Sequence, residues 1–158
     1  MPDRRTPFVD TSERETLVAF LDYLRDAVVV KLEGLSNEDA RRSFVASGTS
    51  VLGLVKHLTM VEVYWLQQSF AGLAVSPSDM VRPEDTCESV RAEYRDASRR
   101  NHEIVAAVTD LETRGAHRHH REGPMSLRWV LVHMIEETGR HAGHADILRE
   151  QIDGVTGR

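Results

Sequence analysis

The sequence predicts an all-α protein, a single four-helix bundle that spans residues 1–158. Four segments of roughly 20 residues each repeat apolar residues at the three- and four-residue spacing of an amphipathic helix. Polar breaks with Ser or Thr at their ends separate these segments, and no stretch alternates as a surface β-strand would. A chain of 158 residues is long enough for one domain with its own core.

The first helix is expected to begin at Ser12 and to end at Gly34. Ser12 and Glu15 form a capping-box pattern, and glycine is the usual residue just past a helix C-terminus. A short helical turn is expected over residues 36–40. The inner stripe of the first helix consists of Leu17, Phe20, Leu21, Leu24, Val28 and Leu32.

The second helix is expected to begin at Thr49 or Ser50 and to run to about Ala71, with Gly72 as its end. It is apolar around most of its circumference, which predicts a central position in the bundle. A loop with two prolines follows it.

The third helix is expected from about Thr86 to Leu111, and residues 112–125 then form a polar loop. The last helix is expected to begin at Ser126 and to end near Gly154, with apolar residues in a near-heptad pattern along one face.

Three residues, His57, Glu137 and His141, form the candidate metal site. Glu137 and His141 are four residues apart, so they lie one turn above each other on the last helix. His57 lies in an otherwise apolar part of the second helix and could complete the site from there. Imidazole nitrogen and carboxylate oxygen suit a divalent ion such as zinc or iron, and three protein ligands leave a position open, as in catalytic sites.

Helix geometry selects Glu137 over its neighbour Glu136. At about 100° per residue, His141 lies within roughly 20° of the centre of the apolar stripe and Glu137 about 60° away. Glu136 lies about 160° away and should point to solvent. His133 and His144 lie roughly 80–100° off centre, where they could contact the ligands from a second shell.

Each part of this pattern also has a simpler interpretation. A histidine on an apolar helix is usually a hydrogen-bonded core residue, and acid–base pairs four apart occur by chance on many helices. The combination is more specific, because an inward-facing carboxylate needs a partner and a divalent cation is one.

Other candidates have structural interpretations that we favour. The loop histidines could bind metal adventitiously but suit a solvated loop, and Cys87 has no base beside it in the sequence, so a buried thiol is expected. Glu62 needs a partner within the bundle, and Arg128 could form a structural ion pair with it. The loop histidines are His117, His119 and His120, and the expected core aromatics, of which one could line a pocket, are Tyr64, Trp65 and Trp129.

Composition restricts the partners and the compartment. A net charge of −5 argues against non-specific nucleic-acid binding. No apolar run reaches the roughly 18 residues of a transmembrane helix, so no membrane partner is expected. One cysteine and the absence of an apolar signal core behind the N-terminus favour a reducing cytoplasm.

Five stretches of the chain resemble the DinB-like superfamily, which includes mycothiol- and bacillithiol-dependent transferases. The most specific stretch holds Glu137 and His141 and resembles an actinobacterial-type branch. The stretches are residues 13–17 (ERETL), 31–35 (KLEGL), 51–58 (VLGLVKHL), 61–65 (VEVYW) and 126–150 (SLRWVLVHMIEETGRHAGHADILRE).

The resemblance implies an up-down-down-up bundle in which His57, Glu137 and His141 hold a divalent metal. Many members have histidine at the position of Glu137, and a glutamate there resembles the mycothiol-dependent maleylpyruvate isomerase branch. Zinc is the expected metal, and iron or nickel would also suit two histidines and a carboxylate.

The expected function is a metal-dependent S-transferase or isomerase that uses a mycothiol-type thiol and a small electrophile. No protein nucleophile is then required, so no catalytic side chain is assigned beyond the metal ligands. The alternatives are a non-catalytic metal- or ligand-binding stress protein and a metal-dependent hydrolase. A homodimer is also expected, since the resemblance implies pairing and apolar side chains on the first and third helices could form the contact.

Overall fold

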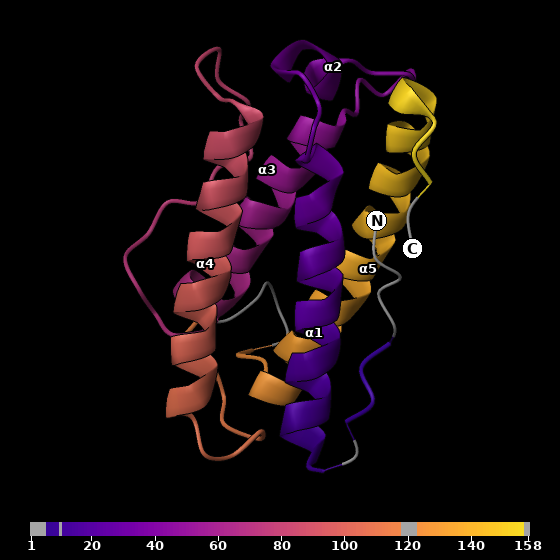
Figure 1. Ribbon diagram of the computed structural model, residues 1–158. Coiled ribbons are helices and arrows are strands. Elements are labelled where there is room, and N and C mark those ends of the chain that lie inside the picture. The colour runs from indigo at the N-terminus through magenta and orange to yellow at the C-terminus, as the bar shows by residue number, and fades with distance from the viewer. Residues whose placement is uncertain (1–5, 10, 118–122, 157–158) are drawn as a thin grey trace.

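The computed structural model describes residues 6–9, 11–117 and 123–156. Four long helices make up the bundle, with one short helix above them (Figure 1). The long helices are α1 (Glu13–Val29), α3 (Val51–Glu62), α4 (Cys87–Ala107) and α5 (Leu127–Asp153), and the short helix is α2 (Asn37–Arg41). A 3₁₀ turn, η1 (Val30–Leu32), extends α1, and a π-helical segment, η2 (Val63–Phe70), extends α3.

The topology is up-down-down-up. In Figure 1, α1 and α5 run upward, α3 and α4 run downward, and the loop of residues 71–86 returns along the length of the bundle to join α3 to α4. α1 packs mainly on α5, α3 on α4, and α3 also on α5. The fold class is therefore confirmed, and no strand occurs in the part of the chain that the structure describes.

The helix ends agree closely with the capping signals. The side chains of Ser12, Ser50, Thr86 and Ser126 each accept a hydrogen bond from a backbone N–H of the first turn. Gly154 ends α5 with a φ of 74°, a left-handed conformation that glycine adopts without strain. The N-terminal caps fix where each long helix begins. They therefore also fix which side chains face the core.

Two helix ends differ from the sequence prediction. The second helix reaches Phe70 as predicted, but its last two turns are π-helical, with bonds such as Ala71 N–H to the Leu66 carbonyl (3.0 Å). The third helix ends at Ala107, because Val108 is extended and the chain turns so that Leu111 is buried beside the bundle. The apolar pattern includes Leu111 although it lies outside the helix.

The core runs the length of the bundle around α3. Eight of the twelve residues of α3 are buried, in accord with its predicted central position. Core residues of the upper half include Val28, Leu52, Val90, Tyr94 and Leu148, and those of the lower half include Leu21, Leu66, Leu127, Leu131 and Met134.

The expected partner of Glu62 was wrong. Glu62 is fully buried and pairs with Arg25 of α1, while Arg128 lies at the exposed end of α5 and pairs with Glu13 and Glu112. An ion pair on Glu62 is present, but helix periodicity could not tell which arginine of another helix would reach it.

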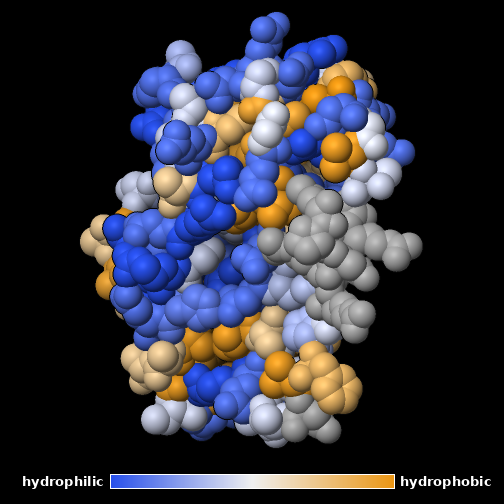
Figure 2. Space-filling model, viewed as in Figure 1, coloured by the Kyte–Doolittle hydropathy of each residue, from blue (hydrophilic) through white to orange (hydrophobic). Residues whose placement is uncertain are grey.

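Exposed apolar side chains are few on the face that carries α1 and α4. Figure 2 shows this face as mostly hydrophilic, with hydrophobic residues in separate patches. Among the described residues, the large exposed apolar side chains of the long helices are Trp129, Val132 and Ile147 of α5. The expected dimer stays a prediction, and apolar side chains of α1 and α4 such as Leu17, Val18 and Ile104 are half-buried against the core. No helix of the described residues is long and apolar enough to cross a bilayer.

Candidate metal centre

His57 reaches the site from the middle of α3. Its side chain is 31% exposed, and its Nε2 lies 3.3 Å from Oε1 of Glu137 across the α3–α5 interface. The Ser50 cap fixes the start of α3 two turns earlier, which sets the face on which His57 lies.

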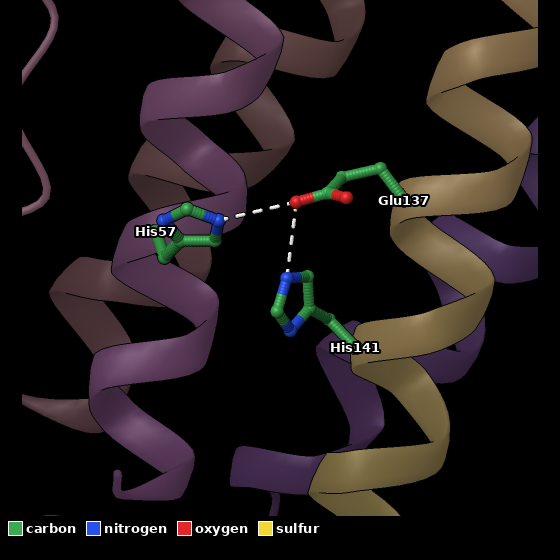
Figure 3. Close-up of side chains that lie close together, drawn as sticks. All are labelled: His57, Glu137 and His141. Carbon is green, nitrogen blue, oxygen red and sulfur yellow. Dashed lines mark hydrogen bonds and ion pairs between the residues drawn. The ribbon is translucent and has the colours of Figure 1, made fainter. Parts of the chain in front are cut away.

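Glu137 and His141 reach the same point from successive turns of α5. Nε2 of His141 lies 3.0 Å from Oε1 of Glu137, so one carboxylate oxygen faces both imidazoles (Figure 3). The two rings meet edge to face, with centroids 4.9 Å apart. Glu136, by contrast, is exposed, as the helical-face argument predicted.

Burial and mutual contacts set the protonation of these groups. Burial lowers the pKa of His141 below its ordinary value, even though the Glu137 carboxylate acts against this. Burial acts to raise the pKa of Glu137, but its hydrogen bond with His57, the charges of His141 and Arg140 and the hydrogen bond with His141 outweigh it and hold that pKa low. The site therefore presents an ionised carboxylate and a neutral His141 near neutral pH, the states in which both groups ligate metals.

The spacing of these atoms fits a metal ion. Donor atoms about 2.0–2.2 Å from a tetrahedral ion lie about 3.4 Å from one another. The two Nε2–Oε1 distances are 3.3 and 3.0 Å, and one ligand atom from each of the three residues lies within 4.8 Å of the others. Two imidazoles and a carboxylate are also a donor set suited to zinc or iron. No other such group of three occurs within the described ranges of the chain.

Comparison with known families decides the relationship of this chain. The sequence model of the family named mycothiol-S-transferase matches residues 16–154, which include all four long helices except the first three residues of α1. The chain belongs to the mycothiol S-transferase family. No curated protein matches the sequence.

Solved structures agree with this family in fold. A DinB-like protein from Bacillus cereus ATCC 10987 has a TM-score of 0.68 and 17% sequence identity, over 89% of this chain and 96% of that one. A conserved protein from Enterococcus faecalis has a TM-score of 0.67 and 12% identity, over 92% of this chain and 100% of that one. Together with the family match over residues 16–154, the shared fold confirms the resemblance to the DinB-like superfamily.

In this member of the mycothiol S-transferase family, an open pocket of about 490 Å³ leads to the two histidines. His57 and His141 form part of its wall, and the segment that precedes and begins α3 forms another part. That segment contributes Ser47, Thr49 and Leu54, and Arg41 and Val81 also line the pocket, so the wall is mixed in polarity. The imidazoles of His57 and His141 can therefore be reached from solvent through this pocket.

Two residues that sequence reasoning missed contact the candidate ligands. Oδ2 of Asp79 lies 3.5 Å from Nδ1 of His57, and Nη1 of Arg140 lies 3.2 Å from Oε2 of Glu137. Arg140 could have been found, because it follows Glu137 by three residues on the same helix. Asp79 could not, because it lies in an irregular loop whose path follows from tertiary packing.

His144 and His133 differ in what they contact. Nδ1 of His144 lies 3.4 Å from Nδ1 of His141, beside the site. The ring of His133 instead packs between Trp65 and Trp129, with no hydrogen bond to the three candidate ligands in the described part of the chain.

The remaining sequence candidates are not among the three candidate ligands. Cys87 is buried at the start of α4, and burial raises the pKa of its thiol. Trp65 is buried as expected, but Trp129 is 41% exposed and was wrongly placed in the core. His117 lies in an exposed loop, and His119 and His120 lie outside the described residues.

Proposed function

We propose that this protein is a divalent-metal-dependent S-transferase that joins a mycothiol-type thiol to a small electrophile. The observation that carries the proposal is the convergence of His57, Glu137 and His141 on one point beside an open pocket, in a chain of the mycothiol S-transferase family. Zinc is the metal we favour, and iron or nickel would suit the same donors.

The three ligands would leave the pocket side of the metal open. A divalent cation bound there would favour the thiolate form of the incoming thiol. Glu137 contributes the one negative charge among the three ligands. His57 and His141 would hold the metal between α3 and α5. The pocket would position the thiol and the electrophile close together, which removes much of the entropic barrier of a two-substrate reaction.

No side chain of the protein needs to act as nucleophile in this scheme. The sulfur of the small thiol attacks the electrophilic carbon, a carbon–sulfur bond forms, the leaving group departs with its electron pair, and the thiol proton passes to solvent. Cys87 does not compete, because it is buried beneath Ser36 and Asn37 and is not part of the pocket wall.

The test is thiol consumption by the purified protein, supplied with mycothiol and monobromobimane, with added zinc and after treatment with a chelator. We expect thiol consumption to require the metal. The rate of consumption should fall by about tenfold or more in Glu137→Gln. Glu136→Gln is the matched control, since its side chain is exposed one residue away.

Three other results would contradict the proposal. Metal binding without thiol consumption would support the non-catalytic binding protein. Substrate hydrolysis without thiol would support the hydrolase. Thiol consumption that persists at the same rate after metal removal would exclude the metal site from the reaction.

A further inference from the structure

A cluster of three aromatic rings joins η2 to the N-terminal part of α5, and Trp129 is its exposed member. The rings of Trp129 and His133 stack at 5.2 Å between centroids and 21° between planes. Trp65 of η2 contacts both, with centroids 4.6 Å from His133 and 5.2 Å from Trp129. We call Trp65, Trp129 and His133 the aromatic shelf.

The aromatic shelf lies on the same side of both helices as the candidate metal ligands. His133 and Glu137 are four residues apart on α5, so they are neighbours about 6 Å apart along the axis, and Trp129 is about 6 Å further. On the other helix, Trp65 follows His57 by eight residues in the continuous α3–η2 helix. Because α3 and α5 are antiparallel (Figure 1), the step from His57 to Trp65 along α3–η2 and the step from Glu137 back to Trp129 along α5 run in the same direction.

Trp129 is the exposed ring of the shelf, since Trp65 is buried and His133 is half-buried. Trp129 is 41% exposed and the adjacent Val132 is 51% exposed, while most of the large side chains near them are in the lower core. Burial lowers the pKa of His133, so its ring is neutral and adds to an apolar surface. Flat, uncharged rings at a surface recognise other flat rings by stacking.

We infer that the aromatic shelf binds the aryl group of the electrophile. The inference rests on the proposed function, because it assigns the substrate class of that same site. If the thiol sulfur lies beside the three candidate ligands, an aryl group joined to the electrophilic carbon could extend toward His133, one helical turn from Glu137. Benzyl-type electrophiles fit this spacing, whereas small aliphatic ones cannot reach the shelf.

The first experiment compares 4-nitrobenzyl bromide with iodoacetamide as electrophiles for the zinc-loaded protein with mycothiol. In both reactions the thiol sulfur bonds to the CH₂ carbon, the halide leaves with the electron pair of its bond, and the thiol proton passes to solvent. Trp129→Ala should raise the KM for the nitrobenzyl compound by roughly three- to tenfold and change that for iodoacetamide by less than about twofold.

Two further variants complete this comparison. Ile147→Ala replaces another exposed apolar residue of α5. It should leave the KM for both electrophiles unchanged. His133→Ala should reproduce the selective loss, which protects the test if one variant folds poorly. Equal changes for both electrophiles in Trp129→Ala, or none for either, would overturn the inference.

A binding measurement separates the shelf from the proposed function. 4-Nitrobenzyl alcohol cannot react, so calorimetric titration without thiol reports binding alone. We expect saturable binding that weakens by roughly three- to tenfold in Trp129→Ala and not in Ile147→Ala. If thiol transfer is absent but this binding is present, the proposed function fails and the shelf stands as an aryl site. The absence of binding to the wild-type protein would overturn the shelf as a substrate site. If the protein is a homodimer and Trp129→Ala converts it to a monomer, the shelf would be a subunit contact, which would also overturn the inference.

Discussion

Glu62 and Glu137 are buried carboxylates on the long helices, and their partners differ in kind. Glu62 of α3 is fully buried, and both of its oxygens accept hydrogen bonds from Arg25, at 2.7 and 2.6 Å. Asn101 donates to one of them as well. Oε1 of Glu137 faces the two imidazoles of His57 and His141 instead. Both residues satisfy the apolar-face pattern, so the pattern alone does not distinguish them.

The difference lies in whether the partner carries a permanent charge. Arginine stays protonated in proteins, so Glu62 is neutralised within the fold. The carboxylate of Glu62 outweighs the effect of burial and raises the pKa of Arg25 above its ordinary value. Imidazole carries no permanent charge, and burial lowers the pKa of His141. Oε1 of Glu137 therefore has no permanently charged partner. A divalent ion would stabilise this carboxylate more than it would stabilise Glu62, which Arg25 already neutralises.

The largest expected effect is on stability when Arg25 is replaced. Arg25→Ala leaves the charge of Glu62 buried without its cation, which should cost about 3–5 kcal/mol of unfolding free energy. Urea unfolding followed by circular dichroism measures this loss.

Arg140→Ala is the matched change on the other carboxylate. Arg140 is half exposed and contacts only the outer oxygen of Glu137, so its loss should cost less than about 1 kcal/mol. Similar losses in both variants would mean that the two carboxylates do not differ as described.

The second expected effect is that zinc stabilises the folded protein and that this stabilisation depends on Glu137 and not on Glu136. Zinc at a hundred times its dissociation constant should stabilise the folded state by about 2.7 kcal/mol, which corresponds to about 5–10 °C in Tm for a domain of this size. Glu137→Gln should remove most of this shift, and Glu136→Gln should keep it. A shift of the same size in Glu137→Gln would place the metal elsewhere.

The sequence predicted the helix faces of the three candidate ligands better than it predicted their surroundings, for a physical reason. The phase of a helix follows from its own caps and periodicity, so Ser50 and Ser126 were enough to bring His57, Glu137 and His141 to inner faces. The partners of those residues depend on how helices and loops pack, which local patterns do not record.

Three failures show this limit. Arg25 rather than Arg128 pairs with Glu62, because the choice depends on which helix is adjacent. Trp129 was assigned to the core as an aromatic residue, yet its side chain is 41% exposed while its neighbours Leu127 and Val130 fill the core. Asp79 approaches His57 from a loop without periodicity.

The third prediction concerns Asp79, which sharpens the comparison by testing the outer side of the metal centre. If the carboxylate of Asp79 orients His57 through Nδ1, Asp79→Asn should weaken zinc binding by about tenfold, the low end for such outer contacts, given a separation of 3.5 Å. Stability without metal should not change. Competition with a chromophoric chelator measures the affinity, and Glu84→Gln is the control from the same loop. An unchanged affinity in Asp79→Asn would show that His57 needs no such partner.

The smallest expected effect is at the matching outer position of the buried pair. Asp22 accepts a hydrogen bond from Nη1 of Arg25 at 3.0 Å, and its Oδ1 also lies 2.9 Å from Nε2 of His102, but its side chain is 40% exposed. Water can replace this carboxylate while Glu62 keeps the guanidinium neutralised, so Asp22→Asn should cost no more than about 0.5 kcal/mol in urea unfolding. Zinc affinity should stay at the wild-type value, because Asp22 lies on α1 and contacts none of the three candidate ligands among the described residues. A loss above about 2 kcal/mol would mean that Arg25 depends on Asp22 as much as on Glu62, and the buried pair would then have to be described as a three-membered network that extends to the surface.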